Sequence, residues 1–389
     1  MKYFFELGRQ PDISTAEIQA VFALLHINTS SATHQSNTNL MVETKTPINC
    51  SELMQRLGGT IKISEQITPG DTIIQTIVEH LQFTNPQGKI HFSVSGKDGE
   101  RIALEVKKQL KHLGRSVRYI EIKNSATIIH NNLVEKQSDF TILNDEVFVT
   151  RAIQDIEAFS KRDYGRPGSD NVSGMLPPKL ARVIINLAQV NSDATILDPF
   201  CGSGTILTEA LSMSFTNLTG SDISEKAVSD TRRNIDWLKS SPNFQSSNLS
   251  ILNLELLLSN ATELDKKLPQ NSIDAIVSEP YMGKPLKGNE TRQQLLAQAD
   301  ELKQLYINSF RSFSNVLKPN SVIVFLIPRF KLKNEWITID CTDEIKEIGF
   351  KIWTFSSSPA KGELEGVSPL LYHRPNQFVG REIWRFKKS

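Results

Sequence analysis

The chain has 389 residues, of which 39% are hydrophobic and 22% charged, so its composition is that of a soluble globular protein with two or three domains. Its 44 basic and 43 acidic residues give a net charge of +1, so any contact with nucleic acid must come from a local basic patch. Three widely spaced cysteines fit neither a disulfide framework nor a zinc site, and no apolar run is long enough to cross a membrane. Since no signal peptide is apparent, we expect a cytoplasmic protein without a metal site.

The first 160 residues have the pattern of two small α+β units. In residues 1–70 we expect strands and helices to alternate at 2–7, 12–25, 40–46 and 50–58, with the Ser/Thr/Asn-rich stretch 27–39 as a loop. In residues 71–160 we expect strands at 89–96, 116–122 and within 140–156, and a helix over 99–114 that ends at Gly114.

A linker is expected over residues 161–179, because 164–179 are rich in Gly, Pro and Ser. In residues 180–389 buried strands then alternate with helices, which predicts a parallel sheet covered by helices on both faces. The expected strands there are 194–200, 217–224, 254–261, 272–279 and 321–328. The last two strands, 350–358 and 378–388, have no helix between them and predict a terminal antiparallel pair.

The sequence "ILDPFCGSGT" (196–205) is the strongest local signal. An apolar strand ends in Asp198, and Gly202 and Gly204 then open a helix, where a ligand can approach the backbone and the free N–H groups. An ordinary strand-to-helix turn would read the same way, and the spacing is not that of a dinucleotide-binding loop.

This motif resembles the first motif of S-adenosylmethionine-dependent methyltransferases that modify exocyclic amines. In that family the acidic residue and the glycine loop hold the methionine end of the cofactor. The resemblance therefore assigns to cofactor binding the residues Asp198, Pro199, Cys201, Gly202, Gly204 and Thr205.

The next two strands end in further candidate cofactor ligands. Asp222, in "GSDIS" beside Ile223, can accept hydrogen bonds from both ribose hydroxyls, although it could also serve as a helix N-cap. Asn260, followed by Ala261, stands where the family often has an aspartate that contacts the adenine amine. Pro177 matches a proline that packs on the cofactor in related enzymes, but a proline at a helix start is common in any case.

The fourth of these strands runs into "SEPY", Ser278 to Tyr281, which is similar to the family pattern Asp/Asn/Ser-Pro-Pro-Tyr/Phe. In one register Ser278 and the backbone carbonyl of Glu279 accept hydrogen bonds from the target amine, Pro280 stiffens the loop and Tyr281 stacks on the flipped base. In the other register the Glu279 carboxylate is the acceptor. A turn without a catalytic role is the remaining alternative.

The basic stretch 101–123 carries seven Lys or Arg against two Glu and is a candidate for phosphate binding, although most charge runs are merely solvated. The candidate RNA-binding residues there and in the linker sequence "KRDYGRP" are Lys107, Lys108, Lys111, Arg115, Arg118, Arg162 and Arg166.

The order of all these features resembles the tRNA guanine-N2 methyltransferases that act at position 10. The resemblance implies an N-terminal ferredoxin-like domain (1–70), a THUMP RNA-binding domain (71–160), the linker and a Rossmann-like catalytic domain (180–389). It also implies S-adenosylmethionine as cofactor and tRNA as partner; some relatives use a small activating subunit, which nothing in this sequence requires. The alternatives are an adenine-N6 nucleic-acid methyltransferase and an inactive RNA-binding protein with a methyltransferase fold.

Overall fold

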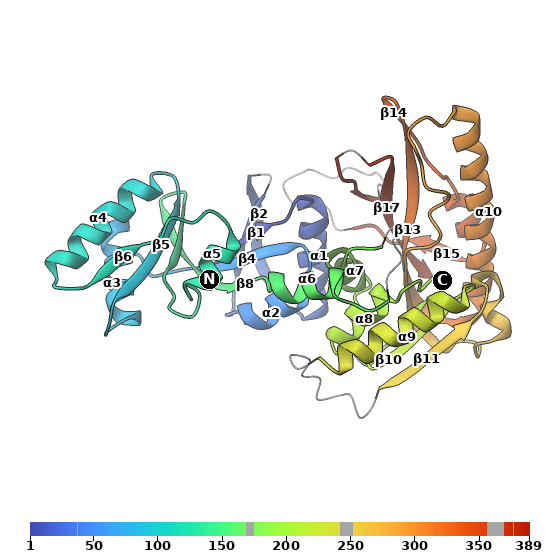
Figure 1. Ribbon diagram of the computed structural model, residues 1–389, viewed down its shortest axis with the longest axis horizontal. Coiled ribbons are helices and arrows are strands. Elements are labelled where there is room, and N and C mark those ends of the chain that lie inside the picture. The colour runs from blue at the N-terminus through green and yellow to red at the C-terminus, as the bar shows by residue number, and fades with distance from the viewer. Residues whose placement is uncertain (37, 169–174, 242–251, 356–368, 376) are drawn as a thin grey trace. The chain divides into compact units, whose positions relative to one another are not determined.

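The computed structural model describes residues 1–389 except 37, 169–174, 242–251, 356–368 and 376 (Figure 1). The chain divides into two compact units. The first holds Met1–Thr15 and His26–Ile156, and the second holds Ala16–Leu25, Glu157–Ser357 and Glu363–Ser389; the short stretch 358–362 lies outside the described residues. The division of the first unit at residue 70 and the linker bounds 161–179 stay predictions, and residues 169–174 of that linker are among those not described.

The first unit is built on an eight-stranded sheet in the order β2-β3-β1-β4-β8-β7-β5-β6. Its strands are β1 (Lys2–Leu7), β2 (Thr29–Ser36), β3 (Asn39–Thr44), β4 (Thr60–Gln66), β5 (Ile90–Gly96), β6 (Val117–Tyr119), β7 (Asp139–Leu143) and β8 (Glu146–Ile153). The helices of this part of the chain are α1 (Pro11–Leu24), α2 (Cys50–Arg56), α3 (Ile73–Thr84), α4 (Gly99–His112) and α5 (Ser125–His130). β5 is parallel to β6 and β7, and the other neighbours are antiparallel, so this unit is α+β as expected.

The expectation of a loop over residues 27–39 was wrong, because that stretch contains β2. This strand is mostly exposed and pairs only with β3 at the edge of the sheet. This edge strand consists of Thr, Ser, His and Gln with a single Ala, so it shows no alternation of apolar and polar residues, which is the pattern that usually reveals a strand. Its threonines are compatible with an extended backbone, because β-branched side chains fit a pleated surface.

A buried polar cluster links the strands in the middle of this sheet. Asp139 is fully buried and accepts hydrogen bonds from the hydroxyls of Ser93 (2.5 Å) and Thr150 (2.6 Å). The Lys62 ammonium lies 3.4 Å from the same carboxylate and donates to the Thr141 hydroxyl at 3.1 Å. A buried charge is tolerated where a counter-charge and hydrogen bonds surround it, so this cluster holds the strands in one register.

The second unit contains the nine-stranded sheet, with the path β11-β10-β9-β12-β13-β17-β15; β14 pairs with β13, and β16 pairs with β17. The strands are β9 (Thr195–Asp198), β10 (Asn217–Asp222), β11 (Asn253–Leu258), β12 (Ile273–Ser278), β13 (Leu317–Leu332), β14 (Glu335–Ile337), β15 (Phe350–Ile352), β16 (Leu370–Tyr372) and β17 (Val379–Lys388). The helices are α6 (Ile156–Tyr164), α7 (Pro178–Leu187), α8 (Thr205–Ser212), α9 (Glu225–Lys239), the 3-10 helix η2 (Ala261–Lys266), α10 (Arg292–Val316) and α11 (Thr342–Glu347). The strands from β11 to β13 are parallel to their neighbours, as the alternation of strands and helices predicted.

The antiparallel end of this sheet is confirmed, since β17 is antiparallel to both β13 and β15. Helix α10 packs on this end through an aromatic cluster. The fully buried ring of Phe310 lies 5.2–5.5 Å from the rings of Phe313, Phe325, Phe350 and Phe386. The last three of these rings stand on β13, β15 and β17, so one helical side chain joins three strands that are distant in sequence.

Within the described part of the chain, no helix combines the length and the apolar character that a membrane span requires.

Candidate active site

The candidate site begins where β9 ends, at the glycine loop that precedes α8. Gly202 and Gly204 have positive φ angles of 52° and 79°, which favour glycine. A Cβ atom on Gly204 would also lie only 2.8 Å from the Cγ2 atom of Thr231. The loop is fixed to the neighbouring strand by a 2.9 Å hydrogen bond from the Cys201 amide to the Ser221 carbonyl. The "CGSG" sequence thus lets the chain turn closely over α9 and open a cavity above the sheet.

One cavity of about 990 Å³ collects the tips of β9, β10 and β12. The predicted residues that line it are Asp198, Pro199, Cys201, Gly202, Thr205, Asp222, Ile223, Asn260, Ala261, Glu279, Pro280 and Tyr281. The carboxyl ends of parallel strands meet at one edge of a sheet, which explains how motifs about 80 residues apart reach one place. Ser278, Gly204 and Pro177 are not among the lining residues; Met175 and Leu176 line the cavity next to Pro177, which caps α7.

Asp198 is a buried carboxylate at the floor of this cavity. It accepts a 2.7 Å hydrogen bond from the Ser278 hydroxyl and a 3.3 Å bond from the Phe200 amide. No described Lys or Arg forms an ion pair with it. Burial raises the pKa of Asp198 to about 7, the hydrogen bond from Ser278 lowers it, and the negative charges of Asp222 and Glu279 raise it further. This carboxylate is suited to receive a cationic group of a ligand.

The Asp222 carboxylate closes the tip of β10. One of its oxygens accepts from the Gly202 amide at 3.0 Å, and the other accepts from the Ser224 amide at 2.9 Å. Each oxygen keeps a further lone pair for a ligand hydroxyl. The next residue, Ile223, is 74% exposed although it is a large apolar side chain, and it offers the cavity a surface for a flat apolar ring.

Asn260 is the N-cap residue of η2. Its side-chain oxygen caps the helix by accepting a 3.1 Å hydrogen bond from the Thr262 amide. The expected hydrogen bond from an adenine amine would have to share this oxygen, which has two lone pairs. The amide NH₂ group of Asn260 is a second polar group at this position.

The first two side chains of "SEPY" have different surroundings. Ser278 is fully buried and directs its hydroxyl to Asp198, whereas Glu279 lines the cavity. The Glu279 carboxylate forms an ion pair with Arg381 of β17. Of the two side chains that the registers offer as acceptor, only that of Glu279 therefore lines the cavity, and the Ser278 hydroxyl is engaged by Asp198.

The Tyr281 loop is held from behind by α10. The hydroxyl of the buried Tyr306 donates a 2.7 Å hydrogen bond to the Tyr281 carbonyl, which fixes the backbone. The Tyr281 ring itself is 52% exposed at the cavity. Gly283 has a φ angle of 90°, which favours glycine, and the side-chain oxygen of the neighbouring Gln298 accepts a 3.1 Å hydrogen bond from the Lys284 amide. The backbone of this loop is therefore held at two points, while the Tyr281 side chain stays half exposed at the cavity.

The two arginines predicted from the linker do not lie on an exposed basic surface. Arg166 is 6% exposed and donates to the Thr205 hydroxyl at 2.5 Å. Arg162 forms an ion pair with Glu209, which also pairs with Arg182 at 2.9 Å. Both side chains are engaged by partners within the second unit. This placement does not fit the expectation that they face RNA.

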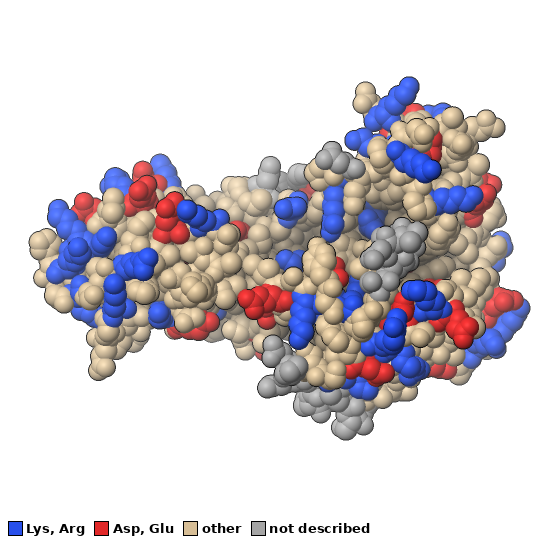
Figure 2. Space-filling view, in the orientation of Figure 1, with Lys and Arg blue, Asp and Glu red and all other residues tan. Residues whose placement is uncertain are grey.

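The other predicted basic residues belong to α4 and the segment after it. Lys108, Lys111 and Arg118 are exposed, while Lys107 is half-buried. Arg115 is also half-buried and donates a 2.6 Å hydrogen bond to the Asn85 carbonyl. Figure 2 shows Lys and Arg side chains gathered over the part of the first unit that carries α3, α4 and β6.

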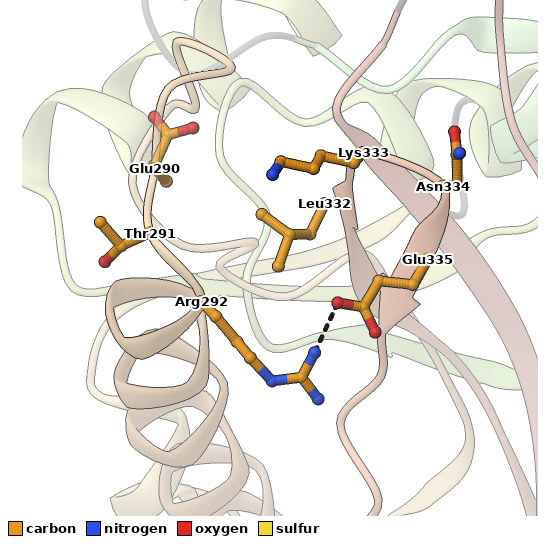
Figure 3. A pocket seen from close by; sticks show the side chains of 7 residues that line it. All are labelled: Glu290, Thr291, Arg292, Leu332, Lys333, Asn334 and Glu335. Carbon is orange, nitrogen blue, oxygen red and sulfur yellow. Dashed lines mark hydrogen bonds and ion pairs between the residues drawn. The ribbon is translucent and has the colours of Figure 1, made fainter.

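A separate hollow of about 650 Å³ lies between the start of α10 and the β13–β14 hairpin (Figure 3). Arg292 donates a 2.5 Å hydrogen bond to Glu335 here, and the Glu290 carboxylate accepts from the amides of Lys287 and Gly288. Thr291 is likewise occupied, since it caps α10. None of the predicted site residues lines this hollow, so the cavity above β9, β10 and β12 is the candidate reaction site.

Comparisons with known proteins point to a methyltransferase domain. The family described as "RMKL-like, methyltransferase domain" matches residues 167–347, and a "DNA methylase" family matches residues 77–233. TrmN from Thermus thermophilus has a similar fold over the whole of both chains, with a TM-score of 0.51 and 16% sequence identity. Fold and site together define a Rossmann-like methyltransferase.

Two archaeal proteins give a finer assignment. The tRNA (guanine(10)-N2)-dimethyltransferase of Methanothermobacter thermautotrophicus is 35% identical over 151 residues, which are 36% of this chain and 38% of that protein. The probable tRNA (guanine(10)-N2)-dimethyltransferase of Methanothermococcus thermolithotrophicus is 30% identical over 156 residues, which are 39% of this chain and 80% of that protein. The chain belongs to the family of tRNA (guanine(10)-N2) methyltransferases. It spans well under half the length of the first of these relatives.

The cavity fits S-adenosylmethionine, the cofactor of such methyltransferases. Asp198 is a buried carboxylate without a described cationic partner, and the cofactor carries an ammonium group. Asp222 can accept from ribose hydroxyls, and the exposed Ile223 suits the apolar face of adenine.

Proposed function

We propose that this chain transfers a methyl group from S-adenosylmethionine to the exocyclic N2 amine of a guanosine in tRNA, at position 10. The observation that carries the proposal is the single cavity lined by Asp198, Asp222 and Tyr281 at the tips of three parallel strands. The names of the archaeal relatives supply the target.

Asp198 and the glycine loop would hold the methionine end of the cofactor, and Asp222, Ile223 and Asn260 would hold the adenosine end. When bound there, the cofactor supplies a methyl group activated by a sulfonium. The buried position of Asp198 supports this role, because an ion pair with the ligand ammonium is stronger where water is excluded.

At the other side of the cavity, Glu279 and Tyr281 would act on the base. The lone pair of the N2 amine is delocalised into the guanine ring, so the nitrogen is a poor nucleophile. A hydrogen bond from the amine to the Glu279 carboxylate or backbone carbonyl favours a more tetrahedral nitrogen, and the carboxylate can take the proton that the nitrogen loses. Tyr281 would stack on the flipped base, an interaction worth about 1–3 kcal/mol.

We further propose that residues 71–160 grip tRNA through phosphate contacts of Lys107, Lys108, Lys111, Arg115 and Arg118. Backbone contacts of this kind position an RNA without reading its sequence. On this proposal residues 1–70 and 71–160 are separate domains, and residues 161–179 link them to a catalytic domain over 180–389. The chain would work in the cytoplasm and would not need an added subunit.

A second candidate is adenine-N6 methylation, which the DNA methylase match favours. That match ends at residue 233, before the "SEPY" segment at 278–281, so it bears on the cofactor loop and not on the base. The choice between the two targets therefore depends on Glu279 and Tyr281.

The experiment is incubation of the purified chain with labelled S-adenosylmethionine and unmodified tRNA, followed by mass analysis of the nucleosides. We expect N2-methylated guanosine at position 10 from the chain alone. N6-methyladenosine would support the second candidate, and tRNA binding without any methylated nucleoside would indicate an inactive RNA-binding protein. Activity only after addition of a cell extract would contradict the absence of a partner subunit.

A further inference from the structure

The ion pair between Glu279 and Arg381 occupies the part of the cavity formed by the loop after β12 and the start of β17. Both side chains line the cavity, and both are mostly shielded, with 13% and 15% of their side-chain surface exposed. The described contact joins Arg381 Nε to Glu279 Oε1. The second carboxylate oxygen and the terminal guanidinium nitrogens have no hydrogen-bond partner among the described residues, so they are available to a ligand.

Arg381 is held in place from the side of the hairpin. Its guanidinium lies 5.8 Å from the centre of the Tyr372 ring, and Tyr372 is its direct partner in the β16–β17 pairing. The Tyr372 hydroxyl in turn accepts a 2.8 Å hydrogen bond from Arg374. An arginine fixed at both its backbone and its head group presents its donors in a constant direction.

The pair matches one nucleobase edge. The Watson–Crick edge of guanine offers two donors, N1–H and N2–H, next to the O6 acceptor. A carboxylate beside a guanidinium offers the complementary order of acceptors and donors. Adenine presents an unprotonated N1 at the corresponding position, and its lone pair would face the carboxylate oxygens.

We propose that Glu279 and Arg381 together form the guanine-reading element of this site, with Glu279 accepting from N1–H and N2–H and Arg381 donating to O6. This inference rests on the proposed function, since it assigns the base specificity of the same cavity. It adds Arg381 to the residues that touch the substrate, and it gives the glutamate a reason to stand where the family pattern has a proline.

The test uses two tRNA substrates that differ only at the target nucleotide, which is guanosine in one and 2-aminopurine riboside in the other. 2-Aminopurine keeps the exocyclic N2 amine but lacks N1–H and O6. The ratio of kcat/KM for the two substrates then isolates recognition of the edge, because inherent differences in amine reactivity are the same for every variant of the protein.

We expect the wild-type chain to prefer guanosine by about 100-fold or more, since each good pairing with a base edge discriminates by about 10- to 100-fold. Glu279→Gln should lower that preference to about 10-fold or less, because its amide meets the guanine donors with a donor of its own. Arg381→Lys keeps the charge but loses the forked donors, so it should give an intermediate ratio.

The matched control is Glu335→Gln. It removes a carboxylate from another arginine–glutamate pair of the second unit, outside the cavity, and should leave the ratio unchanged. If Glu279→Gln slows both substrates equally, the pair only supports the loop and the inference is wrong. If that variant does not fold, Glu279→Asp and Arg381→Lys decide the matter, and an unchanged ratio in both overturns it.

The same data separate this inference from the proposed function. A wild-type chain that methylates neither nucleoside removes the proposed function and the inference with it. A wild-type chain that methylates guanosine and 2-aminopurine equally keeps the proposed function and refutes only the reading of the edge.

Discussion

Cofactor binding should depend on pH through Asp198. The pKa of its carboxyl is raised to about 7 by burial, so in the empty site it is mostly protonated at pH 5.5 and mostly ionised at pH 7.5. If the ionised form binds the ligand ammonium, affinity follows the ionised fraction. With a pKa of about 7 that fraction rises about 25-fold between these pH values, or roughly 2 kcal/mol of binding free energy.

The assay is calorimetric titration of the chain with S-adenosylhomocysteine, which keeps the amino-acid end and cannot react. We expect tighter binding as pH rises from 5.5 to 7.5, with release of a proton near pH 6.5 that appears as a dependence of the enthalpy on the buffer. Protonated Asp198 must lose its proton to pair with the ammonium, which fixes the direction of the effect.

Two variants sharpen this test. Asp198→Asn cannot titrate, so its weaker affinity should be flat across the same range. Ser278→Ala removes the hydrogen bond that lowers the pKa of Asp198, so the midpoint of the wild-type dependence should move to higher pH. An affinity that does not change with pH in the wild-type chain would refute the assignment of Asp198 to the ammonium.

The remaining predictions concern stability and the target base. Because the pKa of Asp198 is raised in the folded protein, its contribution to stability is fully present below pH 4 and is lost as pH rises through about 7. Asp198→Asn should therefore raise the thermal midpoint at pH 8, by an amount equivalent to a few kcal/mol, and change it little at pH 4. Equal changes of the midpoint at both pH values would contradict this. Phe310→Ala removes the ring that joins α10 to three strands, so it should lower the free energy of unfolding in denaturant titrations by about 3–5 kcal/mol. A loss under about 1 kcal/mol would exclude the packing argument. Tyr281→Ala should lower kcat/KM for tRNA by about 10- to 100-fold, whereas Tyr281→Phe should keep most of it, since stacking needs the ring and not the hydroxyl; equal losses in both variants would argue against stacking.

The parallel strands of the second unit could be predicted from the sequence because buried parallel strands have a distinct sequence pattern. β9, β12 and β13 are apolar, are bounded by polar or glycine-rich turns and alternate with helices, so their order and direction follow from local rules. The end of each strand then fixes which residues can meet, and Asp198, Asp222 and Tyr281 could be assigned to one crevice without coordinates.

The direction of the side chains at the ends of these strands could not be predicted from the sequence. Ser278 and Glu279 are neighbours, and which of them faces the cavity depends on the phase of β12 at its last residue. A shift by one position exchanges the buried and the exposed side chain, which is why both registers were open. The ion pair of Arg162 escaped the sequence for another reason: its partner, the buried Glu209 on α8, lies 47 residues away, so no local pattern shows it.

Arg381 was beyond the reach of motif reading for a topological reason. β17 enters the sheet antiparallel between β13 and β15, after the chain has already passed through β15. This insertion carries a residue 102 positions from Glu279 to the same cavity, at a point where the sequence "VGREIW" shows only an ordinary strand. The last strand of the chain therefore supplies a charge to the site that the parallel strands form, and base specificity in this chain would depend on that antiparallel strand as well as on the four-residue segment.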